Sequence, residues 1–464
     1  MINMENEKKL TMKHYLLIAS MLFGMFFGAG NLIFPIHLGQ LAGAHWLTAG
    51  LGFLISGTLL PLLAIIAISV THSNGIYELA KPIGNRYATI FMILVCLTLG
   101  PLFATPRTAT VPFQIGIGNY INPSQTPIFL LIYSIIFFGI TYWASSTPTG
   151  IIDSIGKLLN PAFLILLAIM FGFTFTRPMG TAGKMAASGT AYQDGSFLNG
   201  FLQGYNTMDA IAGLLFGIAI VSTIKGLGQR KSSHISATIF KSGALGIGLE
   251  AIIYLILIWV GATSLNHFPI SADGGIAFGQ IANHYLGLGG QIILAIMATL
   301  TCLTTSVGLS TSFSEALHNK FPQISYRTWN ILTCGLSFII ANFGLETIIA
   351  WSTPMLMFLY PLAITLILLS ILSPLFKRNS IVYIWTTAFT LIPAFLGMIE
   401  SAPAIISKTA FAQALMHFDK MYLPLASYGL DWVVPALIGF ALGLANYFTK
   451  GWLTTQMTQP NENN

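Results

Sequence analysis

Long apolar runs recur along the whole chain, and they constrain its fold more than any other feature. Each is about 18 residues or longer, the length that a helix needs to cross roughly 30 Å of hydrocarbon. Twelve such spans are expected, approximately at 16–41, 46–70, 86–117, 127–145, 157–176, 196–224, 240–264, 288–317, 327–343, 347–372, 380–400 and 428–449. The runs lack period-two alternation, so they predict helices rather than a β-barrel. The chain is therefore expected to be an all-α integral membrane protein with about 12 transmembrane helices.

The basic residues are distributed unevenly between the two sides of these spans. Of the 20 lysines and arginines, Arg107 lies within a span. If the N-terminus is cytoplasmic, only four of the others lie outside the cell: Arg177, Lys184, Lys408 and Lys420. Because cytoplasmic loops of membrane proteins are enriched in lysine and arginine, this predicts that both termini face the cytoplasm. The positive charge is then explained by topology and by contact with the lipid bilayer, and no nucleic-acid partner is expected.

Two of the spans are interrupted near their centres by glycine and polar residues, with the sequences GAGN at 28–31 and GYNTMDAIAG at 204–213. Small residues of this kind often do no more than let two helices pack closely, so one break alone would be weak evidence. The two interrupted spans are five apart in order, however, and an odd shift reverses the direction in which a span crosses the membrane. They predict two inverted five-helix halves, 16–176 and 196–372, with a ligand site between the broken helices.

The remaining segments are then a cytoplasmic N-terminal segment (1–15), two additional helices (380–449) and a cytoplasmic tail (450–464). Non-helical backbone deep in a membrane is tolerated only where it lines a cavity or is buried in protein. At such a break, freed carbonyl groups suit a cation. The amides that start the second half-helix near Asn31 suit a carboxylate.

The eighth span carries a cluster of hydroxyl side chains. Thr301, Thr304 and Thr305 are spaced as i, i+3 and i+4, so they share one face of a helix. Their oxygens would complete a shell around a small hard cation. The alternative is that each hydroxyl donates to a carbonyl of its own helix, as isolated threonines in membranes usually do. The density of the cluster favours the cation site.

Three charged residues, Arg107, Asp209 and Glu250, fall inside the spans, where such residues are rare and commonly functional. Arg107 follows Pro101 and Pro106 in a long span that must tilt or kink, and we expect it to reach an aqueous vestibule. Asp209 adjoins the break in the sixth span, where it would cap a half-helix or bind an amine or a cation. Glu250 has no motif around it, so a structural partner is expected rather than a coupling role.

Four stretches of the chain resemble the bacterial branched-chain amino acid carrier family: GMFFGAGNLIFPIHLGQLAG (24–43), GPLFATPRTATVPF (100–113), GYNTMDAIAGLLFGI (204–218) and CLTTSVGLSTSFSE (302–315). The resemblance runs in order over nearly the whole chain. It implies the leucine-transporter type of fold, with ten core helices in two inverted repeats plus two more. It also implies a bacterial inner membrane protein that imports leucine, isoleucine and valine together with a cation.

The resemblance further implies which residues bind. Sodium, the co-transported ion, would be held by Gly24, Phe27, Thr301, Thr304 and Thr305. The substrate would contact Ala29, Gly30, Asn31, Tyr205, Asn206, Thr207 and Met208. The aliphatic side chain of the substrate is expected to face apolar surface that includes Phe103 and Met208.

Other classes of function are disfavoured. The histidines lack metal-ligand spacing and no serine stands in a nucleophile elbow, so the chain is not expected to be an enzyme or to carry a cofactor. A channel would need a continuous polar pore, against which the broken helices argue. No phosphate-binding loop is present, so transport must draw on an ion gradient. The leading hypothesis is sodium-coupled import, and the alternative is a proton-coupled transporter of these or another small amino acid.

Overall fold

The computed structural model of the protein describes residues 10–118, 120–146, 151–188 and 190–457. The twelve predicted spans fall largely on helical residues, which confirms an all-α membrane protein. Within the described residues, eight helical runs are long and apolar enough to cross a membrane, and shorter apolar helices are Met12–Phe26, Pro161–Thr176 and Val433–Thr449. Most of the predicted N-terminal segment (1–9) and the end of the tail (458–464) lie outside the described residues.

The first five spans are built from helices that are interrupted in three of the five. They are α1 (Met12–Phe26) with α2 (Ala29–Ala42); α3 (Trp46–Leu54), η2 (Ile55–Leu59) and α4 (Leu60–Thr71); α6 (Asn85–Leu97), η3 (Thr98–Leu102), α7 (Ala104–Phe113) and η4 (Gln114–Gly118); α8 (Thr126–Ser146); and α9 (Ile151–Thr176). Short helices η1 (Gly43–His45) and α5 (Ile76–Ala80) connect them. The third span is kinked at Gly100, where φ and ψ are −82° and −119°. The prolines of this span predict such a kink.

The second half begins with another broken helix. Its elements are α11 (Ser196–Gly204), η5 (Tyr205–Thr207) and α12 (Asp209–Gly226); α13 (Ser232–Ser264); α14 (Gly274–Lys320); α15 (Tyr326–Ala341); and α16 (Leu345–Leu372) with η6 (Ser373–Phe376). The short α10 (Thr190–Asp194) precedes it. That the two halves are inverted relative to one another stays a prediction.

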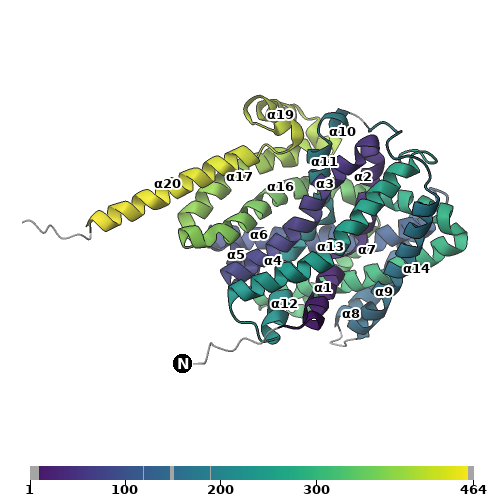
Figure 1. Ribbon diagram of the computed structural model, residues 1–464, viewed down its shortest axis with the longest axis horizontal. Coiled ribbons are helices and arrows are strands. Elements are labelled where there is room, and N and C mark those ends of the chain that lie inside the picture. Colours follow the sequence, from purple (N-terminus) through teal and green to yellow (C-terminus); the bar gives the residue numbers. More distant parts are fainter. Residues whose placement is uncertain (1–9, 119, 147–150, 189, 458–464) are drawn as a thin grey trace, which may run out of the picture.

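Two further long helices, α17 (Ser380–Glu400) and α20 (Val433–Met457), lie side by side at one edge of the bundle (Figure 1). Between them come α18 (Ala404–Ser407), α19 (Ala410–Tyr422) and η7 (Ala426–Tyr428). The last span was predicted at 428–449; its helix, α20, starts several residues later, at Val433, and its apolar part ends at Thr449 as predicted, although the helix continues to Met457. Pro, Gly and Asp before residue 433 and a polar stretch after 449 make hydropathy a poor guide to these ends.

The eighth span is longer than predicted because α14 has 47 residues and carries a bend at Gly287, where φ is +66°. The part of α14 before this bend rests on α2: a Cβ atom at Gly274 would lie 2.0 Å from the carbonyl oxygen of Ile33. Asp273 caps the helix by accepting hydrogen bonds from the amides of Gly275 and Ile276. The first part of α14, before the bend, therefore packs directly on the first broken helix.

Helix α13 packs very closely against the first broken helix. A Cβ atom at Gly39 of α2 would lie 1.9 Å from the carbonyl oxygen of Ile258, and one at Gly261 would lie 2.1 Å from that of Ile36. Only glycine permits such an approach of two backbones. The contact matters for function because α13 carries Glu250 to the break between α1 and α2.

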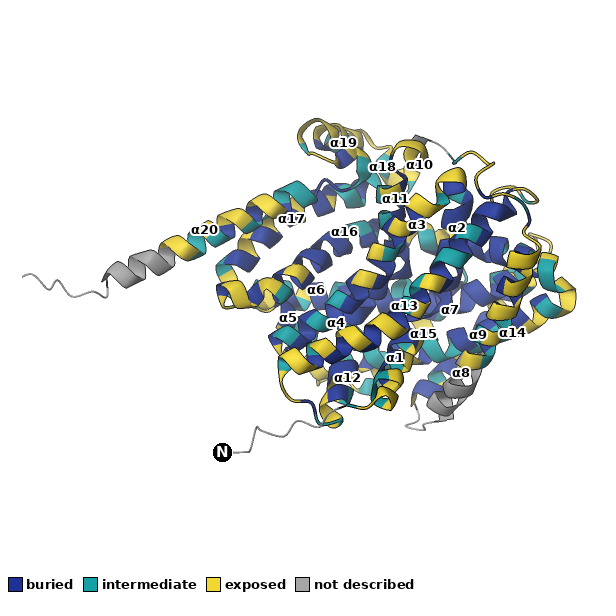
Figure 2. Ribbon diagram, viewed as in Figure 1, coloured by how far each residue is buried: buried dark blue, intermediate teal, exposed yellow. Residues whose placement is uncertain are grey.

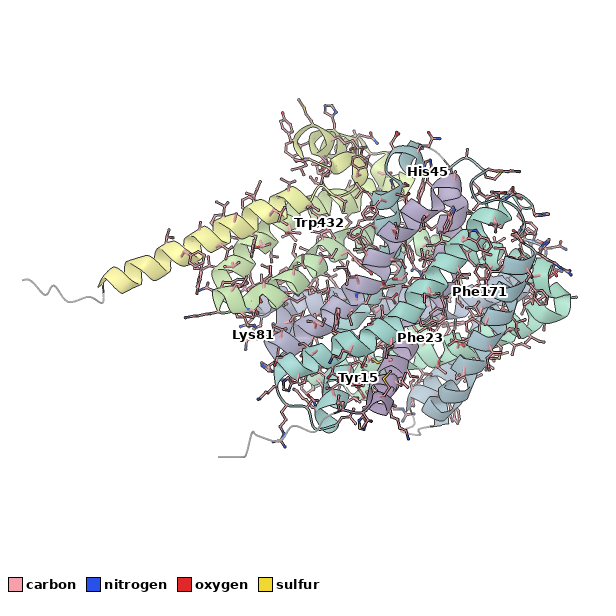
Figure 3. All side chains as sticks on the ribbon, viewed as in Figure 1. Tyr15, Phe23, His45, Lys81, Phe171 and Trp432 are labelled. Carbon is pink, nitrogen blue, oxygen red and sulfur yellow. The ribbon has the colours of Figure 1, made fainter. Side chains whose placement is uncertain are left out.

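The outer helices present apolar side chains to the surroundings, as expected for contact with lipid. On α8, for example, Ile128, Ile132 and Ile136 are 61%, 53% and 58% exposed and follow one face. Residues in the interior helices are largely buried, whereas exposed residues gather on the outer helices and the ends (Figure 2). Tyr15 lies at the lower end of the bundle and His45 at the opposite end in Figure 3, so α1 and α2 together traverse it.

Candidate functional site

The two helix breaks meet at a small cavity of about 50 Å³ inside the bundle. Its lining residues come from the first, third, sixth and eighth spans: Met25, Phe26, Gly28, Ala29, Gly30, Asn31, Leu99, Ala104, Arg107, Thr108, Asn206, Thr207, Met208, Asp209, Ala212, Phe216, Thr305 and Leu309. The wall combines apolar side chains with one cationic and one anionic side chain. Helical breaks that are 178 residues apart in sequence, at Asn31 and Asp209, thus form one site.

At the first break, Asn31 takes over a hydrogen bond of the helix. The amide of Gly28 would continue the helical ladder to the carbonyl of Gly24, but it donates instead to Oδ1 of Asn31 at 3.2 Å. The carbonyl of Gly24 is therefore left without its usual amide partner. The side-chain nitrogen of Asn31 is turned the other way, toward two carboxylates.

A polar cluster that we call the carboxylate cluster joins three helices next to the break: Asn31 of α2, Asp209 of α12, and Glu250 and Tyr254 of α13. Nδ2 of Asn31 donates to Oδ2 of Asp209 at 2.8 Å and to Oε1 of Glu250 at 2.9 Å, and it also contacts the Tyr254 hydroxyl. That hydroxyl donates to Glu250 at 2.7 Å and lies 3.2 Å from Asp209. Asp209 and Glu250 are 3% and 1% exposed. Glu250 therefore has the partners that its position in the sequence did not reveal.

Arg107 lies in the cavity wall and not in an open vestibule, because its side chain is only 3% exposed. Its guanidinium donates to the carbonyl oxygen of Asn206 at 2.9 Å and to the hydroxyl of Ser352, and it lies 5.0 Å from the centre of the Phe34 ring. Nε of Arg107 has no partner among the described residues. A positive charge is thus held beside the second break, and a carboxylate ligand would complete its hydrogen bonds.

The second break is made by Met208, whose left-handed backbone (φ 64°, ψ 8°) is rare for a residue with a side chain. The preceding turn is closed by Thr207, whose hydroxyl donates to the carbonyl of Gly204 at 2.9 Å. Tyr205 is not among the lining residues and stacks on Tyr360, with ring centres 4.0 Å apart. Asn206 remains at the cavity, and its buried Oδ1 has no partner in the described part of the chain.

The threonines of α14 lie beside the first break, and Thr305 is in contact with Gly28. A Cβ atom at Gly28 would lie 3.4 Å from Cγ2 and 3.7 Å from Oγ1 of Thr305. The hydroxyls of Thr304 and Thr305 donate to the carbonyl of Thr301 at 2.7 and 3.2 Å, which is the alternative that the spacing left open. This bond uses the hydroxyl hydrogen and leaves the oxygen lone pairs free for a cation.

The structure brings most, but not all, of the predicted substrate residues to the cavity. Those that line it are Ala29, Gly30, Asn31, Asn206, Thr207 and Met208, together with Arg107, Asp209 and Thr305. Phe103 and Tyr205 are absent from the lining, as are Gly24, Phe27, Thr301 and Thr304. The expectation that Phe103 faces the cavity is not met, since it packs against the hydrophobic core at the start of α7.

Sequence reasoning missed several residues of the site. Tyr254 and Ser352 are single polar side chains in apolar helices without a motif, and their roles depend on contacts across 45 and 245 residues. Met25, Phe216 and Leu309 form part of the apolar wall. The only signal for these three was position, because each lies inside one of the four stretches already noted.

Two solved transporter structures share this fold. The crystal structure of MhsT in complex with L-phenylalanine matches with a TM-score of 0.52 and 17% identity, covering 94% of this chain and 99% of that one. The structure of Mhp1, a nucleobase-cation-symport-1 family transporter, matches with a TM-score of 0.55 and 15% identity, covering 97% of this chain and 94% of that one. Both have the leucine-transporter type of fold, so the predicted fold class is confirmed.

Relatives of known name match almost end to end. The branched-chain amino acid permease BrnQ of Lactobacillus delbrueckii subsp. lactis is 42% identical, with coverage of 94% of this chain and 97% of the permease. BraB of Bacillus subtilis is 39% identical, covering 94% of this chain and 95% of its own, and BrnQ of Escherichia coli K12 is 35% identical, covering 91% and 93%. The family model described as branched-chain amino acid transport protein matches residues 11–449. The chain therefore belongs to the branched-chain amino acid transport protein family, as its four motifs predicted.

Proposed function

We propose that this protein is a secondary active symporter that imports leucine, isoleucine and valine across the bacterial inner membrane together with sodium. The observation that carries the proposal is the cavity between the two helix breaks, which has a cationic wall at Arg107 and an anionic wall at Asp209. Opposite charges on a partly apolar cavity fit a zwitterion with an aliphatic side chain. The names of the permeases to which the chain is similar agree with that substrate class.

Each part of the amino acid has a counterpart in the cavity. The α-carboxylate would meet the amides near Gly30 and Asn31, which begin α2, together with the guanidinium of Arg107. The α-ammonium would meet the carboxylate of Asp209. Met25, Met208 and the other apolar lining residues would receive the side chain. Since one methylene changes binding in an apolar pocket by only about 1–3 kcal/mol, the three branched-chain amino acids are expected to compete.

Sodium is proposed to bind between the first break and α14. The carbonyl of Gly24 has lost its amide partner to Asn31, and the hydroxyls of Thr304 and Thr305 keep their lone pairs free. Oxygen ligands of this kind suit a small hard cation. Phe27 and Thr301 would complete the ligand set, and the buried hydroxyl of Thr301 has no partner in the described part of the chain. A bound ion would join the first helix to the eighth and favour the conformation that holds substrate.

Proton coupling is the second candidate, because two buried carboxylates, Asp209 and Glu250, share the same hydrogen-bonding partners, Asn31 and Tyr254, inside the membrane. Purified protein in liposomes separates the two candidates. With an inward sodium gradient and no pH gradient, [³H]leucine should accumulate, and replacement of sodium by choline should abolish accumulation. Accumulation in choline driven by an inward proton gradient would instead establish proton coupling. A protein that only equilibrates leucine under every gradient would contradict symport.

The orientation of the chain is a separate part of the proposal. Both termini are expected in the cytoplasm, because few lysines and arginines lie on the opposite side. Reporter fusions after Lys231 and after Lys450 should report the cytoplasm, and a fusion near Lys184 should report the outside. A C-terminal reporter outside the cell would overturn the assignment.

A further inference from the structure

We propose that Asp209 and Glu250 share a single proton when substrate is bound, and that this proton-binding site is distinct from the cation site at the threonines of α14. The inference rests on the proposed transport of a zwitterionic amino acid and adds a second ionic requirement to it. It applies whether sodium or another ion drives accumulation. The carboxylate cluster is the observation that carries it.

The cluster brings two acidic side chains to the same hydrogen-bond donors. Nδ2 of Asn31 is 2.8 Å from Asp209 and 2.9 Å from Glu250, and the Tyr254 hydroxyl is within 3.2 Å of both. Two ionised carboxylates this close repel each other, and burial removes the water that would screen them. In other proteins such pairs hold one proton between them.

No side-chain cation offsets these charges. Among the residues that the structure describes, neither carboxylate has a lysine, arginine or histidine within ion-pairing distance. Arg107 from α7 lines the same cavity, but its hydrogen bonds go to Asn206 and Ser352. The other titratable groups that face the pair are the phenols of Tyr254 on α13 and Tyr360 on α16, and neither carries a positive charge in any protonation state. A proton is the simplest species that lowers the net charge of the cluster.

Asn31 connects this proton to substrate. Its Oδ1 accepts from the amide of Gly28 and its Nδ2 holds both carboxylates, so the cluster sets the start of α2. The α-carboxylate of the substrate is proposed to bind the amides at that start. With Glu250 protonated and Asp209 ionised, Asp209 is free to attract the α-ammonium. Loss of the proton would place an extra negative charge beside the substrate carboxylate and weaken binding.

The Glu250→Gln variant tests the proposal because glutamine resembles the protonated acid. Leucine binding to purified protein is measured at saturating sodium between pH 5.5 and 9. The dissociation constant of the wild type should rise with pH, at most tenfold per pH unit for a single proton. The ratio between its values at pH 9 and pH 6 should fall toward 1 in Glu250→Gln. The matched control is Glu346→Gln, an exposed glutamate of α16 that should keep the wild-type slope.

A second variant keeps the test decisive if Glu250→Gln folds poorly. Tyr254→Phe preserves the ring and removes the hydroxyl that donates to Glu250 and lies beside Asp209, so the ionised form loses support and the pH dependence should move to higher pH. A wild-type binding curve that is flat with pH, or a Glu250→Gln variant with the wild-type slope, overturns the proposal. Wild-type protein that binds no leucine at any pH would refute the proposed function instead.

Discussion

Replacement of Thr305 by valine gives a direct test of the cation site. Valine has nearly the same shape as threonine, so the methyl group that lies 3.4 Å from the Cβ position at Gly28 is retained while the oxygen is lost. Only one hydrogen bond disappears with it, the 3.2 Å bond to the carbonyl of Thr301. Insertion and packing should therefore be close to those of the wild type, and the change should act on the ion.

The size of the effect follows from the loss of one oxygen next to a charge. Interactions of a polar group with a charged partner contribute about 1.5–3 kcal/mol. Thr305 is partly accessible and Thr304 keeps its own oxygen, so the lower end is expected. At about 1.4 kcal/mol per factor of ten, the sodium concentration for half-maximal leucine uptake should rise roughly tenfold. By reciprocity, leucine affinity should fall at low sodium and recover at high sodium.

The assay is sodium-dependent [³H]leucine uptake into liposomes, with the amount of inserted protein measured for each variant. Thr305→Ser is the matched control, because it keeps the oxygen and loses only the methyl group. It should stay near the wild-type sodium requirement. Unchanged sodium dependence in Thr305→Val, or an equal loss in both variants, would refute the assignment of this hydroxyl to the ion.

Three further predictions concern the packing, the cavity and the start of α14. Gly246→Ala should lower the melting temperature of the purified protein, because its Cβ would lie 2.3 Å from the carbonyl oxygen of Ala19. The control is Gly248→Ala on the same helix, whose Cβ would meet nothing within 4 Å and should leave the melting temperature unchanged. Arg107→Lys should weaken leucine binding about tenfold with little change in sodium dependence, since lysine cannot replace a guanidinium that makes two hydrogen bonds. Leucine binding equal to that of the wild type would contradict a role for the guanidinium. Burial raises the pKa of Asp273, outside the membrane-spanning helices, to about 6, so the folded state favours its protonated form and stability should fall as pH rises from about 4 to about 6. Asp273→Asn, which can still cap α14, should therefore stabilise the protein more at pH 8 than at pH 4, and an equal effect at both values would contradict this.

Much of the fold could be predicted from the sequence because the bilayer imposes local rules. Apolar length alone placed each predicted span largely on helical residues, although α14 begins at Gly274, well before the predicted start of its span. The breaks at Gly28 and Met208 were visible as glycine and polar residues inside apolar runs. Such signals are local, since each depends only on whether a short segment can complete its own backbone hydrogen bonds in hydrocarbon.

The composition of the site depended on tertiary structure. Asn31, Asp209 and Thr305 were singled out because they stand in or beside motifs. Glu250 was noted only as a charge inside a span, and its hydrogen bond with Asn31 joins residues 219 positions apart. Phe103 was expected at the cavity from the sequence, but it is not among the lining residues and packs against the hydrophobic core instead. Hydropathy and motif spacing indicate whether a segment is a membrane helix and where it is broken, but they do not indicate which helices pack against each other.

The physical reason is that the decisive contacts are made by helix packing. Glycines at Gly39 and Gly261 let α13 approach α2 so closely that Glu250 and Tyr254 reach Asn31. The sequence by itself therefore determined a membrane-embedded bundle with two broken helices and a family of transporters. Only the packing of α13 against the break decided that a pair of carboxylates, and with it a proposed proton site, would stand beside the substrate cavity.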